Sequence, residues 1–391
     1  MFSINKYAFT NSMVLWDPTT QCGSYGYIYN THNIYNQNYY NFLEVLLEML
    51  YIVTFNNYFG QHLKTECSLD ILKIKSTLNN KDIETEIIEL HDLINNGIEP
   101  NSYYWITSHQ NQHIKKYLND IVLSLFINKN ENLVTSLELY FAHENKGIQS
   151  LLYNNGNDIN LVKQDYLIDS EDVKEQSVFK LIDGSGSSGV YLVESKKNIE
   201  KIIKNKNLIN LSIYNLAKLT KKMIRRLASG KYNIKAEKYY EKKTPYVLQS
   251  FINGLKYDYK VLVFWDHLYV LERKVRENDF RASGSGLFNF IEPDDNLLIF
   301  CNDIRKTINS PFVSIDVISL DNGNYHCIEY QATHFGPYTQ LNSDFYYQVS
   351  DSNDIIRKEK NCTLEDEYAY SIYQFLIKIK KIKKIKKIKC I

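Results

Sequence analysis

The spacing of apolar and polar residues divides the chain into parts of different kinds. From SLDILKIKSTL through ETEIIELHDLI, SYYWITS and NDIVLSLFI, strand-like and helix-like patterns alternate over lengths typical of an α/β layer. The later part of the chain is rich in strand patterns, among them PYVLQSFI, YDYKVLVFWD, HLYVLERKV, FVSIDVISL and YHCIEYQA. The patterns therefore predict an α/β layer followed by a strand-rich block.

Three further apolar patterns predict helices. NFLEVLLEMLYIV (residues 41–53) has helix-like spacing, and AHENKGIQSLLYNNG predicts a helix that ends at Gly156. A third helix, over about residues 364–389, carries FLIKIKKIKKIKKIKCI, where isoleucine recurs at every third position from Ile379 to Ile388. Such a narrow apolar stripe flanked by lysines suits the surface of an anionic membrane, and a solvated tail is the alternative.

A glycine-rich segment at residues 180–193, KLIDGSGSSGVYLV, fits the dinucleotide fingerprint G-x-G-x-x-G. That fingerprint requires a helix directly after the glycines, whereas here they run into the β-branched and aromatic run VYLV. The segment therefore predicts a β-hairpin with a glycine tip. Because Lys180 precedes the loop and neither H-R-D nor D-F-G follows it, a protein kinase is excluded. A phosphate-binding tip and a plain hairpin turn remain open.

Charged residues gather on two predicted strands that are joined by a turn at residues 265–267. These strands and the loop after them carry Asp258, Lys260, Arg273, Lys274, Arg276 and Arg281. Because side chains alternate along a strand, Arg273 and Lys274 point to opposite faces. A set so rich in cations suits a triphosphate and an acyl phosphate, and a solvated strand face paired with nearby acids is the alternative.

Two acids lie inside apolar strands, Asp316 in SIDVI and Glu329 in CIEYQ, with a turn at residues 321–324 between them. A hairpin makes the two strands neighbours, so both carboxylates can face one side. Buried carboxylates need a partner. Two hard oxygen ligands beside a triphosphate indicate a shared Mg²⁺ ion, and a structural salt bridge is the alternative.

Composition limits the partners and the location. With 46 Lys+Arg against 45 Asp+Glu, opposite charges nearly cancel, so we expect no nucleic acid partner. The first residues do not have the pattern of a secretion signal, and no run approaches about 18 uncharged apolar residues. Six cysteines without C-x-x-C pairs argue against a zinc site and suit a reducing, cytoplasmic location.

Three histidines lie outside these motifs. His109 and His113 have the i, i+4 spacing of metal ligands on a helix, but no third ligand with suitable spacing follows. We therefore interpret them as solvated polar residues. His334, in QATHFGP just past the second acid, is interpreted either as a substrate contact or as an ordinary loop histidine.

The order of these motifs over residues 140–345 resembles the ATP-grasp superfamily, which includes D-alanine–D-alanine ligase, glutathione synthetase and the ribosomal-protein glutamate ligases. The resemblance implies an ATP-grasp fold of the α/β and α+β class, in which two α+β subdomains clasp ATP after an α/β N-terminal domain. The implied parts are an N-terminal substrate domain (1–139), a central subdomain with the glycine-rich lid (140–245), a C-terminal subdomain with the metal site (246–363) and a basic amphipathic helix (364–391).

The resemblance also implies roles for individual residues. The implied nucleotide contacts are Lys146 and Lys180, the lid residues Gly184, Ser185, Gly186, Ser187, Ser188 and Gly189, the hinge residues Gln249, Ser250, Phe251 and Ile252, and Asp258 and Lys260. Arg273 and Arg281 match arginines near the phosphates and the acyl intermediate. Asp316, Glu329 and Gln331 match ligands of Mg²⁺ or Mn²⁺. The chain departs from the family at Gln331, where Asn is usual, at Ser250, where an acid is frequent, and at Lys260, where Arg is common.

Members of this superfamily usually join a carboxylic acid to an amine through an acylphosphate. The resemblance therefore implies a ligase that forms an amide bond with release of ADP and phosphate. Its substrates would be small-molecule, peptide or glycan carboxylates and amines. A small-molecule kinase on the same scaffold and a non-catalytic nucleotide-binding module are the alternatives. The lysine-rich tail adds the inner face of an anionic membrane as a potential peripheral contact.

Overall fold

The computed structural model describes residues of one structural unit, Glu48–Ile391. The described residues are 49–60, 69–153, 157–183, 189–209, 220–221, 224, 239, 243–277, 279–320 and 324–389. Side chains are described for all of these except 207–209 and 381–389. Several predicted features lie outside the described residues. They are the part of the first predicted helix up to residue 48, the predicted helix end at Gly156, the glycine tip 184–188 and the turn residues 321–323.

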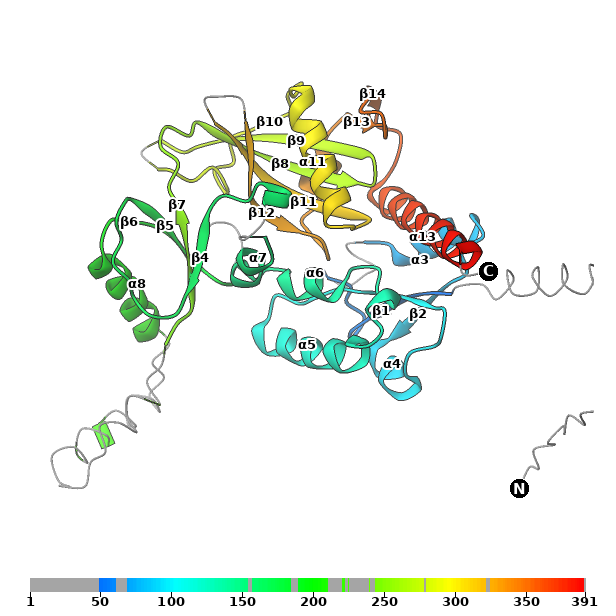
Figure 1. The fold of residues 1–391 in the computed structure, drawn as a ribbon, viewed down its shortest axis with the longest axis horizontal. Helices are drawn as coiled ribbons and strands as arrows, with labels where there is room; N and C mark the ends of the chain where they lie inside the picture. The colour runs from blue at the N-terminus through cyan, green and yellow to red at the C-terminus, as the bar shows by residue number, and fades with distance from the viewer. Residues whose placement is uncertain are drawn as a thin grey trace, which may run out of the picture. The chain divides into compact units, whose positions relative to one another are not determined.

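The first part of the unit is a parallel sheet of three strands, in the order β2-β1-β3, accompanied by helices (Figure 1). Its elements are β1 (Leu50–Thr54), α3 (Ile71–Asn79), β2 (Thr85–Glu89), α4 (Leu90–Asn96), β3 (Tyr103–Ile106), α5 (Gln112–Phe126) and the short η1 (Asn130–Asn132). Parallel neighbours need a crossover between them, and here helices supply it. The alternation of strands and helices that the sequence predicts is confirmed.

The helix predicted for residues 41–53 is wrong in its last part. Leu50–Thr54 forms β1, the central strand of the parallel sheet, and four of its five residues are buried. A short strand that is covered on both faces is apolar throughout. Hydrophobic periodicity cannot separate such a strand from a buried helix, which explains the error.

The central part is an antiparallel sheet of four strands in the order β4-β7-β5-β6. Its elements are β4 (Gln164–Leu167), β5 (Ser177–Leu181), β6 (Val190–Val193), α8 (Lys196–Ile209) and β7 (Tyr246–Ser250). Helix α8 covers the sheet through Ile199, which packs with Phe179, Val193 and Tyr246 (Figure 1). Strands β5 and β6 pair as the hairpin that the glycine segment predicts.

A larger antiparallel sheet follows, in the order β12-β11-β8-β9-β13-β14, with β10 paired to β9. Its strands are β8 (Tyr257–Phe264), β9 (His267–Lys274), β10 (Phe288–Asn289), β11 (Phe312–Ser319), β12 (Tyr325–Gln331), β13 (Phe345–Val349) and β14 (Ile355–Glu359). The helices of this part are α11 (Asp295–Thr307) and α12 (Tyr338–Asn342). The strand-rich half that the sequence predicts is confirmed.

The two faces of this sheet belong to different cores. Val261 and Val263 of β8 pack with Leu298 and other residues of α11, which crosses the sheet in Figure 1. Leu262 and Phe264, at the alternate positions, pack in the cluster that holds the C-terminal helix. Because successive side chains of a strand point to opposite faces, a strand covered on both sides is apolar without interruption.

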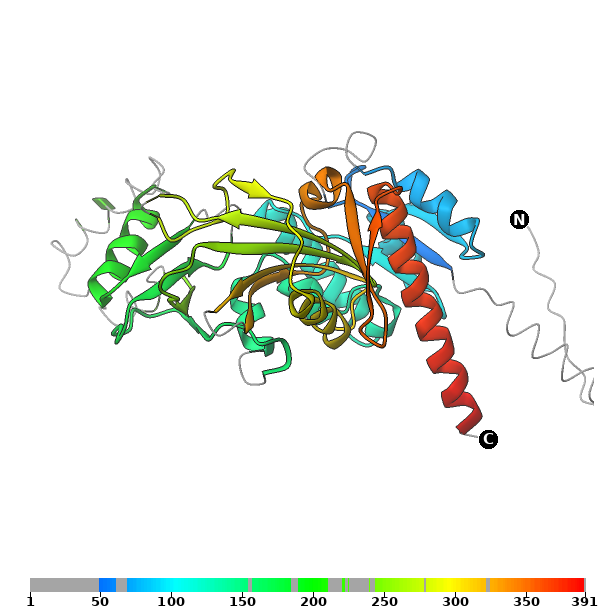
Figure 2. The same ribbon diagram turned by 90° about the horizontal axis from the view of Figure 1, so that it is seen from above.

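The C-terminal helix α13 (Leu364–Lys389) is in its first half an element of the core. Tyr368, Ile372 and Phe375 are buried, and the helix packs beside α3 (Figure 2). Ile379, where the predicted apolar stripe begins, packs against the same cluster. This isoleucine is therefore oriented by the core of the protein. Among the described residues, no helix is both long enough and apolar enough to span a membrane.

The helix predicted for AHENKGIQSLLYNNG, residues 142–156, begins only at Lys146. The preceding helix α6 (Leu137–Ala142) ends where the predicted helix should start, a break follows, and α7 (Lys146–Tyr153) and the short η2 (Asn157–Ile159) come after the break. The break contains Glu144, whose φ of 46° is left-handed. A right-handed helix cannot continue through a residue in that conformation. The side chain of Asn145 then accepts a hydrogen bond from the backbone N–H of Ile148 at 3.2 Å, which supports the start of α7.

Candidate functional site

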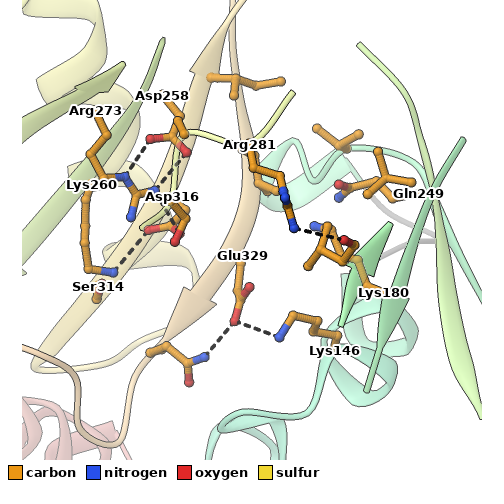
Figure 3. Close-up of a pocket in the computed structure, with 18 of the residues that line it drawn as sticks. Lys146, Lys180, Gln249, Asp258, Lys260, Arg273, Arg281, Ser314, Asp316 and Glu329 are labelled. Atoms are coloured by element: carbon orange, nitrogen blue, oxygen red, sulfur yellow. Dashed lines mark hydrogen bonds and ion pairs between the residues drawn. The ribbon is translucent and has the colours of Figure 1, made fainter. Parts of the chain in front are cut away.

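A cavity of about 450 Å³ is lined by strands of the central sheet and of the large sheet (Figure 3). Its volume lies in the range of small-molecule sites. Five cationic side chains and four carboxylates line it: Lys146, Lys180, Lys260, Arg273, Arg281, Glu144, Asp258, Asp316 and Glu329. The cavity therefore combines a nearly balanced set of charges with the space for a small ligand.

Two buried lysines reach this cavity from the side of the central sheet. Lys146 is the first residue of α7, its backbone N–H donates to Ile182 O at 3.1 Å, and its Nζ lies 3.4 Å from Oε1 of Glu329. Lys180 lies on β5, where it is 5% exposed. Burial lowers the pKa of Lys180 to about 8, and the negative charge of Glu329 partly offsets this effect. The two lysines and Glu329 thus face one space.

The end of β7 and the residues after it border an apolar part of the cavity, called here the apolar slot. Gln249, Ser250, Phe251 and Ile252 line the cavity there, and Nε2 of Gln249 donates to Oε1 of Gln164 at 3.1 Å. The apolar residues that line the cavity with them include Val162, Val178, Val190, Leu255, Ile318 and Ile328. Apolar walls beside Phe251 and Ile252, which follow the last paired residue of β7, suit a flat ring that hydrogen-bonds with the backbone.

Glycine is required at the base of the hairpin. Gly189 has a φ of 82°, and a Cβ atom added to it would lie 2.7 Å from Cδ1 of Leu181. The carbonyl oxygen of Gly189 accepts a hydrogen bond from the N–H of Leu181 at 2.9 Å. The last glycine of the segment is therefore explained by the geometry of the hairpin. The other lid residues, 184–188, lie outside the described residues.

Four charged side chains of the large sheet form one network beside the cavity. Nε and Nη2 of Arg273 donate to the two carboxylate oxygens of Asp258 at 2.6 and 2.9 Å, and Nη2 lies 3.0 Å from Oδ2 of Asp316. Nζ of Lys260 donates to Oδ1 of Asp316 at 3.1 Å. Figure 3 shows the four side chains together, on strands β8, β9 and β11. The predicted opposite orientation of Arg273 and Lys274 is confirmed, because Arg273 is buried and Lys274 is exposed.

The two aspartates of this network are in different electrostatic states. Burial raises the pKa of Asp258 to about 6, against the lowering effect of Arg273. Burial also acts to raise the pKa of Asp316, but the charges of Arg273 and Lys260 outweigh it and hold that pKa well below its usual range. Asp316 therefore stays ionised to a lower pH than Asp258 does.

Strands β11 and β12 bring Asp316 and Glu329 side by side, as the sequence predicts. The register shifts directly after Asp316, so that Ile328 has no partner on β11. A bulge of this kind changes the direction of neighbouring side chains. In this structure both Ile328 and Glu329 line the cavity, and Nε2 of Gln331 donates to Oε1 of Glu329 at 3.0 Å.

Arg281 lies in the loop after β9 and lines the cavity apart from the Arg273 network. Its Nε and Nη2 donate to the carboxylate of Asp279, at 3.0 and 2.7 Å, and its Nη1 lies 3.5 Å from the carbonyl oxygen of Val190. The structure therefore brings both predicted arginines to one cavity but does not bring them into contact. Arg281 connects the loop of the large sheet to β6 of the glycine hairpin.

A lysine missed in the sequence analysis bonds the break between α6 and α7. Lys115 of α5 is 4% exposed, and its Nζ donates to the carbonyl oxygens of His143 at 2.8 Å and Glu144 at 3.1 Å. Lys115 shares a helix face with the buried Leu118 and Val122. The sequence signal that could have identified Lys115 is its place at an apolar position of an amphipathic helix.

His143 and His334 form a buried pair in the wall of the cavity. Their Nε2 atoms lie 3.1 Å apart, so that one ring donates to the other. Burial lowers the pKa of both imidazoles, to about 3 for His334. His334 is thus a residue of the cavity wall, whereas His109 lies in the loop before α5 and does not share a helix with His113.

The donor set beside the cavity fits a divalent ion that is shared with phosphate oxygens. Among the described residues, no group of three or more His, Cys, Asp and Glu side chains could hold a metal by itself. Mg²⁺ is usually held by one or two carboxylates together with substrate phosphates and water. Asp316 and Glu329 meet that requirement. Oε1 of Gln331 accepts a hydrogen bond from the N–H of Glu144 at 3.0 Å, and its second lone pair remains for an ion.

No protein-family model and no curated protein matches the chain. Solved structures do match the chain. D-alanine–D-alanine ligase from Bacillus anthracis, complexed with ATP, is 13% identical, covers 75% of this chain and 91% of its own, and has a TM-score of 0.42. A RimK-domain ATP-grasp protein from Sphaerobacter thermophilus is 10% identical, covers 84% of this chain and 98% of its own, and has a TM-score of 0.45.

A third similar structure is a RiPP-associated ATP-grasp ligase from Chryseobacterium gregarium in complex with ADP, a leader and a core peptide. It is 12% identical, covers 85% of this chain and 97% of its own, and has a TM-score of 0.45. Identities at this level transfer neither a substrate nor a reaction. The chain is similar in fold to ATP-grasp ligases, the superfamily that its sequence resembles.

Proposed function

We propose that the protein is an ATP-dependent ligase that couples a carboxylate to an amine and releases ADP and phosphate. The observation that supports this proposal is the convergence of Lys146, Lys180, Asp316 and Glu329 on one cavity that also has an apolar slot. Lysines, paired carboxylates and apolar walls are the groups that a metal-bound nucleoside triphosphate needs.

ATP would lie with its adenine in the slot at the end of β7, where Phe251 and Ile252 follow the paired strand and offer backbone groups, and neighbouring apolar side chains offer contact area. Its phosphates would lie toward Lys146 and Lys180. The five cations and four carboxylates of the lining leave a formal charge of +1, which does not balance a triphosphate. A divalent ion at Asp316, Glu329 and Gln331 supplies the missing positive charge when bound.

The proposed reaction has two steps. An oxygen of the acid attacks the γ-phosphorus of ATP, the bond from that phosphorus to the bridging oxygen breaks, and ADP leaves. The amine nitrogen then attacks the acyl carbon of the acylphosphate, the C–O bond to phosphate breaks, inorganic phosphate leaves, and the nitrogen loses a proton to the solvent. One oxygen of the acid therefore ends in the phosphate.

Residues of the chain would stabilise the charges of these steps. Lys146 and Lys180 would offset charge on the phosphoryl group, and Arg281, at the edge of the cavity, would bind the oxyanion. Arg273 is bidentate to Asp258 and is also bonded to Asp316. We therefore assign Arg273 to positioning Asp316, at some distance from the reacting atoms. The glycine lid would exclude water from the acylphosphate.

The test uses purified protein, ATP and Mg²⁺ with a panel of carboxylic acids labelled with ¹⁸O, each tried with and without amines, including hydroxylamine. We expect ADP release that depends on both an acid and an amine, and transfer of ¹⁸O to phosphate. A Lys180→Met variant controls for background hydrolysis. A phosphorylated product that needs no amine would indicate a kinase. ATP binding without turnover would indicate a non-catalytic module, and release of AMP would contradict the proposal.

A further inference from the structure

The carboxylates that would hold the metal are already paired with cations of the protein. Oδ1 of Asp316 is bonded to Lys260 at 3.1 Å, and its Oδ2 is 3.0 Å from Nη2 of Arg273. Oε1 of Glu329 lies 3.4 Å from Nζ of Lys146. A divalent ion that binds these oxygens must therefore compete with ammonium and guanidinium groups that are built into the cavity.

The two cations on Asp316 differ in how firmly they are held. Arg273 is 5% exposed, and two of its nitrogens bond Asp258 in addition to the contact with Asp316. Among the described residues, Nζ of Lys260 bonds only Asp316; its side chain is 24% exposed and lines the cavity. A guanidinium fork that is bonded at two sites stays in place, whereas a single ammonium on a flexible stem can change its partner.

Electrostatics determine when Lys260 would leave. A divalent ion and an ammonium group cannot share the edge of one carboxylate without strong repulsion at a separation of a few ångströms. Without a nucleotide, the displaced ammonium loses its partner in a partly buried site. With a triphosphate in the cavity, the same ammonium group finds phosphate oxygens close by. The ion is therefore favoured when the nucleotide is present and disfavoured when it is absent.

We infer that Lys260 is a built-in counter-cation of Asp316, which makes the cavity select the complex of a divalent ion with a nucleoside triphosphate over either component alone. The inference rests on the proposed nucleotide site. It also gives a reason for Lys at a position where the resemblance leads one to expect Arg: the bidentate fork of an arginine would hold Asp316 too firmly to be exchanged. Because coupling between two ligands is reciprocal, nucleotide affinity must rise with the ion by the same factor.

The experiment measures Mn²⁺ binding to the full chain by the EPR signal of free Mn²⁺, with and without AMPPNP. For the wild type we expect weak binding of Mn²⁺ alone and at least tenfold tighter binding with AMPPNP, which corresponds to about 1.4 kcal/mol of coupling. Lys260→Met should bind Mn²⁺ alone at least threefold more tightly than the wild type and should reduce the coupling factor. Asp316→Asn identifies the site, because the binding of interest is the part that this change removes.

Two control variants separate this effect from others. Lys116→Met removes the same charge from an exposed lysine that pairs with Asp120, and it should bind Mn²⁺ as the wild type does. Lys260→Arg keeps a cation on Asp316, so Mn²⁺ alone should not bind more tightly than to the wild type. Circular dichroism checks that each variant is folded.

The outcomes distinguish this inference from the proposed function. If Lys260→Met binds Mn²⁺ alone no better than the wild type, or if Lys116→Met shows the same gain, the inference is wrong while the ligase proposal stands. If the folded wild type binds no AMPPNP, the ligase proposal fails. The comparison of Mn²⁺ alone between the wild type and Lys260→Met still decides whether the lysine competes with the ion. If Lys260→Met does not fold, Lys260→Gln provides the same comparison.

Discussion

Oε1 of Gln331 accepts a hydrogen bond at 3.0 Å from the backbone N–H of Glu144, which ties β12 to the break between α6 and α7. Nε2 of the same side chain donates to Glu329 at 3.0 Å. Gln331 thus holds a carboxylate of the cavity and, at the same time, the turn that precedes Lys146. The longer side chain of Gln, compared with the Asn that is usual in the superfamily that the sequence resembles, has a structural role here.

Gln331→Asn is expected to lower the free energy of unfolding by about 1 kcal/mol, although Asn is the residue that the family resemblance leads one to expect. The shortened side chain cannot reach both Glu144 and Glu329, so the N–H of Glu144 loses its acceptor. Urea denaturation measures the effect, and Gln340→Asn, at a buried glutamine outside this contact, is the control. An unchanged or raised midpoint for Gln331→Asn would contradict the assigned role.

Lys115→Met is expected to destabilise the protein by about 1–3 kcal/mol and to weaken AMPPNP binding. The change leaves the carbonyl oxygens of His143 and Glu144 without the ammonium donor that satisfies them in a partly buried turn. Denaturation and titration with AMPPNP measure the two effects. Lys116→Met, at the exposed neighbouring position, should change neither. Equal stability of the two variants would show that Lys115 does not support the turn.

The affinity for AMPPNP should fall as the pH rises through about 8. The pKa of Lys180 is lowered to about 8 by burial, so the free protein carries the positive charge below that pH and loses it above. Between pH 7 and 9 the expected loss of affinity from this group is about tenfold. Lys180→Arg keeps the charge throughout that range, so its affinity should be nearly constant. Parallel pH profiles for the two proteins would exclude Lys180 as the phosphate-binding group.

Phe375→Ala is expected to cost about 3–5 kcal/mol of unfolding free energy, because this side chain of α13 is 4% exposed and belongs to the core that joins α13 to the parallel sheet. Chemical denaturation measures it. Ile356→Ala, at a position that is 55% exposed, serves as the control and should cost less than 1 kcal/mol. A small effect of Phe375→Ala would mean that α13 does not contribute to the core.

The sequence predicted those features that depend on local patterns. The hairpin of β5 and β6 follows from a β-branched run directly after the glycines, and the pairing of Asp316 with Glu329 follows from two apolar strands around a turn. Strand β1 was mistaken for part of a helix because a short strand covered on both faces has no alternation to reveal it.

Features that depend on tertiary contacts could not be predicted. Helix α7 begins only at Lys146, after a break at Glu144, whose carbonyl oxygen and N–H bond Lys115 and Gln331, residues that are distant in the sequence. The sequence placed Arg273 among candidate phosphate ligands by its charge. Its bidentate bond to Asp258 depends on the register of β8 against β9. Charge and spacing identify which residues gather at a site, but the pairing among them is decided by register and packing.

The most direct test of the central claim is a crystal structure of the protein with AMPPNP and Mn²⁺, in which anomalous scattering locates the metal. The account predicts one nucleotide in the cavity, with its phosphates at Lys146 and Lys180 and Mn²⁺ bound by oxygens of Asp316 and Glu329 and of the phosphates. A nucleotide bound elsewhere, or a metal that touches neither carboxylate, would contradict it.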